Sequence, residues 1–157
     1  MTAVVSEDEG QLLFSRPLVS TMALDGSEPI AGARHAARSF MTDVQAVHGL
    51  PVSDRAMSTV ELVVSELVTN AYTYAPGPCL LELEVGAGVV GISVWDTAAQ
   101  LPVVSPPDPS RIGKHGLEIA LAVCRSFEVR REPVGKRVKV TIGLADDSDG
   151  APAGSLL

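Results

Sequence analysis

The period of the apolar residues changes abruptly in the middle of the chain. Over residues 61–75 apolar side chains recur at three- and four-residue spacing, which predicts a helix. Residues 75–78 read Ala-Pro-Gly-Pro and end that pattern. Over residues 79–85 apolar and polar side chains alternate, which predicts a strand with one buried and one exposed face. A chain that carries both periods is expected to pack helices against a sheet.

The same alternation predicts two β-hairpins. After the glycine-rich turn at residues 86–88, Val90, Ile92 and Val94 continue the buried face in a second strand. Another pair of strands is predicted over residues 127–131 and 137–142. The glycines of the first turn match a dinucleotide-binding fingerprint, but a strand follows them where that fingerprint needs a helix. We therefore interpret them as a hairpin turn.

Two helices are predicted before the first hairpin. Ser27 as N-cap and Pro29 in the first turn begin a helix that runs to about Val47. Ser53 and Asp54 cap the next helix. Upstream, the β-leaning residues 11–23 predict one or two edge strands. The predicted inner face of the first helix consists of Ile30, Ala33, Ala37, Phe40, Met41 and Val44.

These elements predict the fold class α+β, as a two-layer sandwich with a mixed or antiparallel sheet covered on one face by helices. We expect a single domain over residues 11–144, with a flexible tail at 1–10 and a disordered tail at 145–157. Residues 97–112 hold four of the eleven prolines and predict a long loop of the kind that is often functional. A short helix is predicted after the loop, from Leu117 to Cys124.

Composition excludes several classes of protein. The net charge of -7 argues against a nucleic-acid partner, which would require a basic surface. No apolar run is long enough to cross a membrane, and the two cysteines form no disulfide framework. The cysteines and histidines match no pattern for a nucleophile or a zinc site. We expect a cytoplasmic protein that binds neither nucleic acid nor membrane directly.

Glu66 and Asn70 are the first candidate functional residues. They stand four residues apart in the predicted helix, so their side chains lie one above the other. A carboxylate next to a carboxamide supplies a proton acceptor beside an oxygen ligand for a hard cation. A solvated helix face is the alternative.

Asp96 shares the parity of the buried residues in its strand, so its carboxylate is predicted to face the apolar layer. It would there accept a hydrogen bond from an amino group of a ligand; alternatively, the strand has already ended and Asp96 begins a turn. Farther on, Gly113 and Gly116 precede the predicted short helix, and free amides at a helix start bind anions. Arg111 and Lys114 add positive charge nearby, although glycines at such junctions are also common for steric reasons.

The order of these features resembles the histidine-kinase-like ATPase (GHKL) superfamily, whose ATP site consists of an N box, an aspartate box and a glycine box. Residues 66–71, Glu-Leu-Val-Thr-Asn-Ala, are similar to the N box of the anti-sigma factor/serine-protein kinase branch in its actinobacterial form. The resemblance covers about residues 12–144 and implies a Bergerat-type ATP-binding fold. Three features depart from the pattern: no glycine follows Asp96, Tyr74 replaces a histidine, and the glycine box, Gly113 to Gly116, is short.

The resemblance also implies roles for individual residues. Asn70 would bind Mg²⁺, and Glu66 would be the general base or would orient a water on the metal. Asp96 would accept from the adenine amino group and so select ATP over GTP, and residues 97–112 would form the ATP lid. Gly113, Gly116 and the amides that follow, beginning with Leu117, would hold the phosphates, with Arg111, Lys114 and His115 as further phosphate contacts.

The function that this resemblance implies is an ATP-binding, Mg²⁺-dependent serine-protein kinase and anti-sigma factor. It would phosphorylate an anti-anti-sigma (STAS-domain) partner, sequester a sigma factor and act as a homodimer. Two alternatives remain open at this stage: a regulatory protein of the same fold that acts by partner exchange without catalysis, and an unrelated small α+β enzyme.

Overall fold

The computed structural model describes residues 17–97, 118, 122 and 124–145, and the main elements in them are five strands and two helices. Their order agrees with the sequence prediction: strand, two helices, hairpin and second hairpin. The elements are β1 (Leu18–Leu24), α2 (Ile30–Ala46), α3 (Asp54–Tyr74), β2 (Cys79–Gly86), β3 (Val89–Asp96), β4 (Ser126–Arg131) and β5 (Lys136–Gly143).

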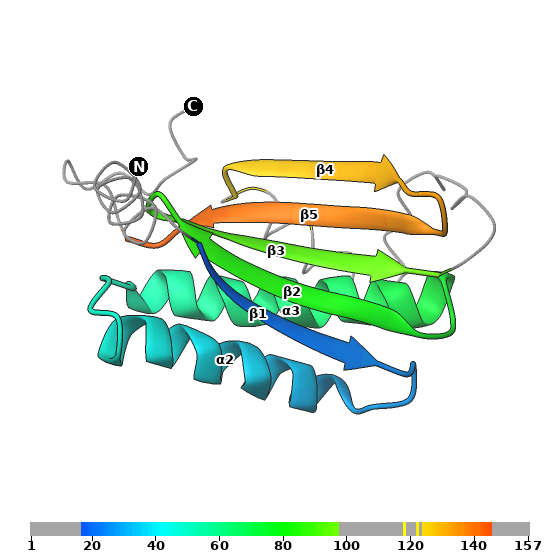
Figure 1. Ribbon diagram of the computed structural model, residues 1–157, viewed down its shortest axis with the longest axis horizontal. Coiled ribbons are helices and arrows are strands. Elements are labelled where there is room, and N and C mark those ends of the chain that lie inside the picture. The colour runs from blue at the N-terminus through cyan, green and yellow to red at the C-terminus, as the bar shows by residue number, and fades with distance from the viewer. Residues whose placement is uncertain (1–16, 98–117, 119–121, 123, 146–157) are drawn as a thin grey trace, which may run out of the picture.

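The strands form one sheet in the order β1-β2-β3-β5-β4 (Figure 1). Every neighbouring pair is antiparallel, so the sheet is antiparallel throughout rather than mixed. Both predicted hairpins are confirmed. The last strand, β5, returns between β3 and β4, and this brings distant residues side by side, from Trp95 with Arg137 to Val89 with Gly143.

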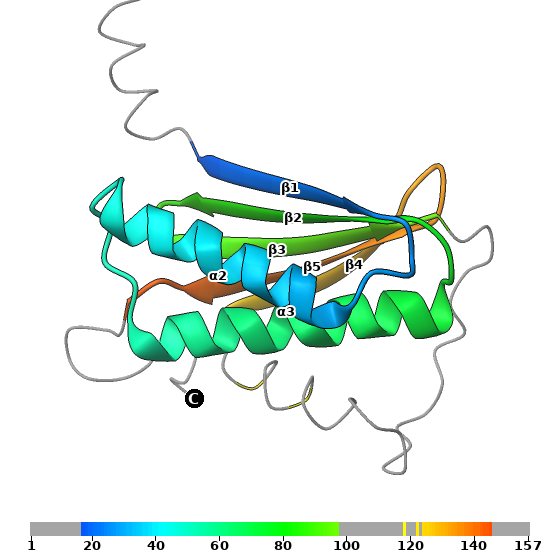
Figure 2. The ribbon, with the colours of Figure 1, turned by 90° about the horizontal axis from the view of Figure 1, so that it is seen from below.

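Both helices cover the same face of the sheet (Figure 2). Alternate residues of β2 and β3 point into the layer between sheet and helices, as the period of two predicted. The α+β two-layer class is therefore confirmed. The buried core contains Ala33, Ala37, Met41 and Val44 from α2, Val60, Val63, Val64, Leu67 and Val68 from α3, and Leu81, Leu83, Val85, Val90, Ile92, Val94, Val140 and Ile142 from the sheet.

The start of α3 follows the prediction, whereas the start of α2 does not. The Ser53 hydroxyl accepts a hydrogen bond from the Ala56 backbone N–H at 3.0 Å, as an N-cap does. At α2 the cap is Pro29, with extended backbone and no side-chain cap. The prediction that Ser27 is the N-cap was wrong, because its hydroxyl donates to the carboxylate of Asp25 at 2.6 Å instead.

The glycine-rich turn between β2 and β3 is a hairpin turn, as predicted. Ala87 and Gly88 both have positive φ, 53° and 78°, and a strand follows them directly. Of the predicted helix over residues 117–124, the described residues Glu118 and Ala122 are helical, but Cys124 is not.

The remaining boundary predictions lie largely outside the described residues. These are the segment 11–16, the loop over residues 98–112 and the tails at 1–10 and 146–157. No helix in the described part of the chain is long and apolar enough to span a membrane.

Candidate functional site

Helix α3 carries Glu66 and Asn70, both half-buried, one turn apart in its C-terminal half. The helix lies against α2 on one side and against β3 and β5 on the other. Glu66 Oε2 is buried and accepts no hydrogen bond from the described part of the chain. Burial also raises the pKa of the Glu66 carboxyl. An acceptor in such surroundings is costly unless a donor reaches it, which makes this atom the strongest sign of a ligand or substrate site.

Asp96 is the last residue of β3, and its side chain is buried to 4% exposure. The predicted orientation toward the apolar layer is confirmed, and the alternative that Asp96 begins a turn is wrong. It pairs in register with Cys79, the first residue of β2, which follows the C-terminal end of α3. Asp96 and the half of α3 that carries Asn70 therefore meet at one end of the sandwich, on the same side of the sheet.

Lys136 is a neighbour of Asp96 that the sequence prediction missed. Its ammonium Nζ lies 2.6 Å from Asp96 Oδ2, and its backbone N–H donates to Asp96 Oδ1 at 3.2 Å. The side chains of the two residues are only 15% and 4% exposed, so this is a buried ion pair. Parity offered a signal, because Lys136 is in phase with the buried residues Val140 and Ile142 of the same strand.

Gly135 makes room for this ion pair. Its φ is +73°, and a Cβ at this position would overlap the Asp96 carbonyl oxygen and lie 2.7 Å from Oδ1. Only glycine fits both the left-handed backbone and the close approach. The turn between β4 and β5 is thus shaped around the end of β3.

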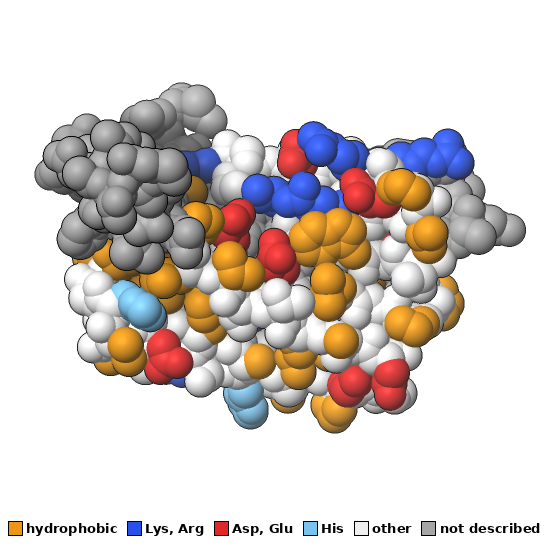
Figure 3. All heavy atoms as spheres, in the orientation of Figure 1, with side chains coloured by type: hydrophobic (Ala, Val, Ile, Leu, Met, Phe, Trp, Pro, Cys, Tyr) orange, Lys and Arg blue, Asp and Glu red, His pale blue; other side chains and the backbone are white. Residues whose placement is uncertain are grey.

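Trp95 points to the opposite, open face of the sheet. The Arg137 guanidinium lies 4.9 Å from the centre of its ring, within cation–π range, and also donates to the Ser93 hydroxyl at 3.3 Å. Figure 3 looks onto this face, where a band of Lys and Arg side chains lies over β4 and β5. Trp95 and Asp96 are consecutive residues of β3, so their side chains lie on opposite faces of the sheet.

Residues 98–112 of the proposed lid and the six residues predicted to contact phosphate lie outside the described residues. Their roles stay predictions. The six are Arg111, Gly113, Lys114, His115, Gly116 and Leu117.

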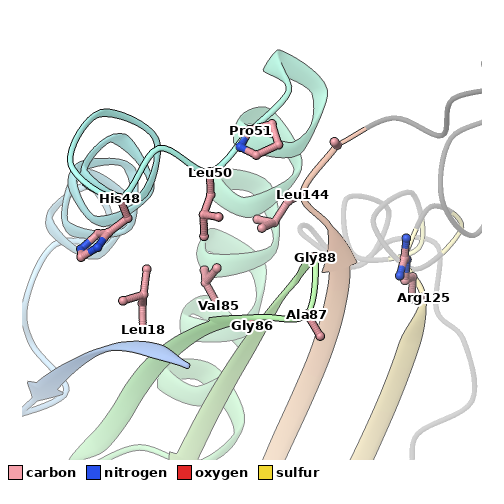
Figure 4. A pocket seen from close by; sticks show the side chains of 11 residues that line it. Leu18, His48, Leu50, Pro51, Val85, Gly86, Ala87, Gly88, Arg125 and Leu144 are labelled. Atoms are coloured by element: carbon pink, nitrogen blue, oxygen red, sulfur yellow. The ribbon is translucent and has the colours of Figure 1, made fainter. Parts of the chain in front are cut away.

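A pocket of about 520 Å³ lies at the other end of the sheet (Figure 4). The β2–β3 turn forms part of its lining, together with Leu18, Leu50, Val85 and Leu144, and His48 lies at the side. β3 begins at this turn and ends at Asp96, so Asp96 lies at the opposite end of the strand. The pocket is therefore separate from the site formed by α3 and the end of β3.

The histidine kinase-like ATPase domain family matches residues 30–142 of the chain. The chain belongs to this family. Membership implies a site for ATP. The match covers α2, α3, β2, β3, β4 and nearly all of β5, including Glu66, Asn70 and Asp96, whereas β1 lies before it. No curated protein matches the chain.

Two solved structures are similar to this histidine kinase-like ATPase domain. The crystal structure of the RsbU and RsbW domains of Rv1364c from Mycobacterium tuberculosis has a TM-score of 0.60 and 15% identity, over 87% of this chain and 33% of that chain. The histidine kinase domain from the Erythrobacter litoralis EL346 blue-light activated histidine kinase has a TM-score of 0.47 and 16% identity, over 86% of this chain and 69% of that chain. This chain thus spans about a third of the mycobacterial chain, and at such identity the likeness concerns the fold alone.

The residues present fit ATP and its metal. Mg²⁺ is usually bound through one or two protein ligands together with substrate phosphates, so a site needs few protein oxygens. Asn70 and Glu66, one turn apart on α3, would supply such oxygens, and among the described residues no three His, Cys, Asp or Glu side chains gather into a metal site. The buried Glu66 Oε2 needs a donor, and a metal-bound water would supply one.

Proposed function

We propose that this histidine kinase-like ATPase domain is a serine-protein kinase and anti-sigma factor of the cytoplasm. Its substrate is a serine of an anti-anti-sigma (STAS-domain) protein, and its regulatory target is a sigma factor, which it binds as a homodimer. Support comes from the resemblance of residues 66–71 to an N box, from the family match and from the fold-level likeness to an RsbW domain.

The observation that carries the proposal is the state of Glu66. Its Oε2 is buried without a hydrogen-bond donor from the described residues, and burial raises the pKa of its carboxyl. A general base works best when its pKa lies near the working pH, and a raised carboxyl pKa moves toward that condition. A carboxylate that served only to solvate the helix surface would not be held in this way.

Each residue of the site has one task in the reaction. Glu66 accepts the proton of the substrate serine hydroxyl while the serine oxygen forms its bond to the γ-phosphorus and the bond to the ADP oxygen breaks. Asn70 would supply an oxygen ligand to Mg²⁺, which when bound would neutralise charge on the phosphates. Asp96 would orient the nucleotide through the adenine amino group. Positioning and electrostatics provide the rest, so no covalent nucleophile is required.

A second function has an observation in its favour. Lys136 already engages the Asp96 carboxylate, and residues 97–99, Thr-Ala-Ala, supply no glycine after it. A domain with a modified base pocket fits a regulator that binds nucleotide weakly or not at all and acts by partner exchange. The two functions differ in whether phosphate is transferred.

Transfer of phosphate from [γ-³²P]ATP to STAS-domain proteins tests the proposal. We expect the wild-type protein with Mg²⁺ to label one such partner on a serine. Glu66→Gln should bind ATP normally but lose at least a hundredfold in transfer rate, since general-base catalysis contributes about 10²–10⁴-fold.

Glu61→Gln is the matched control, because Glu61 lies on the same helix and pairs with Arg38 away from the site. It should label the partner at the wild-type rate. Equal transfer by Glu66→Gln and Glu61→Gln would show that Glu66 is not the base. Binding of ATP without transfer to any STAS-domain protein would favour partner exchange instead.

A further inference from the structure

The ion pair at the end of β3 places a hydrogen-bond acceptor, the Asp96 carboxylate, next to a donor, the Lys136 ammonium. Asp96 Oδ2 and Lys136 Nζ are 2.6 Å apart, and the backbone N–H of Lys136 fixes the other carboxylate oxygen at 3.2 Å. The side chains come from neighbouring strands and point to the same side of the sheet as the core residues. The Lys136 side chain is 15% exposed and the Asp96 side chain 4%, so both are largely shielded from water.

The chemistry of the two groups differs. An ammonium has three N–H donors, of which the contact with Oδ2 occupies one, and carries no acceptor. A carboxylate accepts through two oxygens and can serve more than one donor. The pair therefore offers a ligand an acceptor next to a donor, which is the pattern that a carboxamide side chain uses to recognise adenine.

Adenine carries the complementary pattern, an amino-group donor flanked by ring-nitrogen acceptors. We propose that Lys136 is a second base-recognition residue, whose ammonium donates to a ring nitrogen beside the amino group that Asp96 accepts. The inference rests on the proposed ATP site, and it does not depend on kinase activity. Lys136 stays paired with Asp96 when the nucleotide is bound, so the base contacts the ion pair without breaking it.

The surrounding backbone supports this role. Gly135 holds a left-handed turn whose missing Cβ lets Lys136 approach the end of β3, and its φ of +73° disfavours any other residue. Lys139, three residues farther along β5, lies with its stem against Gly91 on the open face of the sheet. Two lysines of one strand thus occupy opposite faces, and only Lys136 faces the helix layer.

Nucleotide analogues test the inference on the whole protein. In 1-deaza-ATP and 7-deaza-ATP one of the two ring nitrogens beside the amino group is replaced by carbon, and purine riboside triphosphate lacks the amino group. Dissociation constants are measured from the fluorescence of Trp95, the only tryptophan of the chain, which lies next to Asp96. We expect one deaza analogue to bind the wild-type protein about tenfold more weakly than ATP, which corresponds to about 1.4 kcal/mol.

The variant Lys136→Met should bind ATP about tenfold more weakly than the wild-type protein. It should bind ATP and that deaza analogue with equal affinity. Lys139→Met removes one positive charge from the other face of the sheet. It should keep the wild-type dissociation constants for ATP and for the deaza analogue. The pairwise comparison isolates the contact between Lys136 and the ring nitrogen.

The outcomes separate the inference from the proposed function. If ATP binds more tightly than purine riboside triphosphate but both deaza analogues bind like ATP, the Lys136 contact is refuted while the Asp96 site stands. If no nucleotide binds, both are refuted. Should Lys136→Met fail to fold, the analogue series on the wild-type protein still decides.

Discussion

Replacing Lys136 by Met removes the positive charge beside the Asp96 carboxylate while keeping most of the side-chain volume. At 2.6 Å the two charges attract each other by about 6 kcal/mol at an effective dielectric constant of 20, which sets an upper limit. Removing one partner of a buried ion pair costs roughly 3–5 kcal/mol. Because the backbone N–H of Lys136 still donates to Asp96 Oδ1, we expect a loss at the lower end, about 3 kcal/mol.

Thermal unfolding measures this loss. For a domain of this size each kcal/mol shifts Tm by about 2–4 °C, so Lys136→Met should lower Tm by about 6–12 °C. The chain offers a matched control in Arg38 and Glu61, which also approach to 2.6 Å but are 59% and 23% exposed. Arg38→Met should cost no more than about 1 kcal/mol, since water screens that pair.

A double-mutant cycle with Asp96→Asn completes the test. The double variant should be more stable than the sum of the two single losses predicts, because the neutral carboxamide no longer needs the ammonium. Equal losses for Lys136→Met and Arg38→Met, or additive effects in the cycle, would refute the assignment of a buried ion pair.

Three further predictions concern the fold and the helix that carries the site. Burial raises the pKa of Glu66, so the folded state holds its proton more tightly and loses stability as pH rises from 4.5, the ordinary value, through the folded-state pKa. Glu66→Gln should therefore raise Tm at pH 7, with a difference that disappears below pH 4.5; a constant difference would contradict this. Gly135→Ala should lower Tm far more than Gly88→Ala, although both glycines have positive φ, because only the first meets backbone atoms; similar losses would count against the close approach. Ser53→Ala should cost about 1 kcal/mol in urea unfolding and Ser27→Ala much less, since only Ser53 caps a helix; the reverse order would contradict the assigned caps.

Much of the fold could be predicted because it depends on local patterns. The period of two predicts which residues of β2 and β3 are buried, and the same parity predicts that Asp96 faces the core. The cap at Ser53 could be predicted because Ser53 and Asp54 follow the break at residues 48–51. At Ser27 the same rule failed, because the Asp25 carboxylate competes for that hydroxyl.

The partner of Asp96 could not be predicted from local patterns. Lys136 stands forty positions later, and the two meet only because β5 returns beside β3 and not beside β4 alone. The alternation along β5 predicts that Lys136 faces the helix layer, but its partner in that layer depends on the order of strands in the sheet. Likewise, the periodicity of α3 placed Glu66 and Asn70 on one face, while the burial of Glu66 Oε2 depends on packing.

The thermal shift with Mg-ATP tests the central claim most directly. Saturation at about a hundred times the dissociation constant should stabilise the folded state by about 2.7 kcal/mol and raise Tm by several degrees. Asn70→Ala should abolish the shift. Ser58→Ala, about 18 Å earlier along the same helix, should keep it. A wild-type melting curve that Mg-ATP does not move, or a full shift with Asn70→Ala, would contradict a nucleotide site on this face of α3.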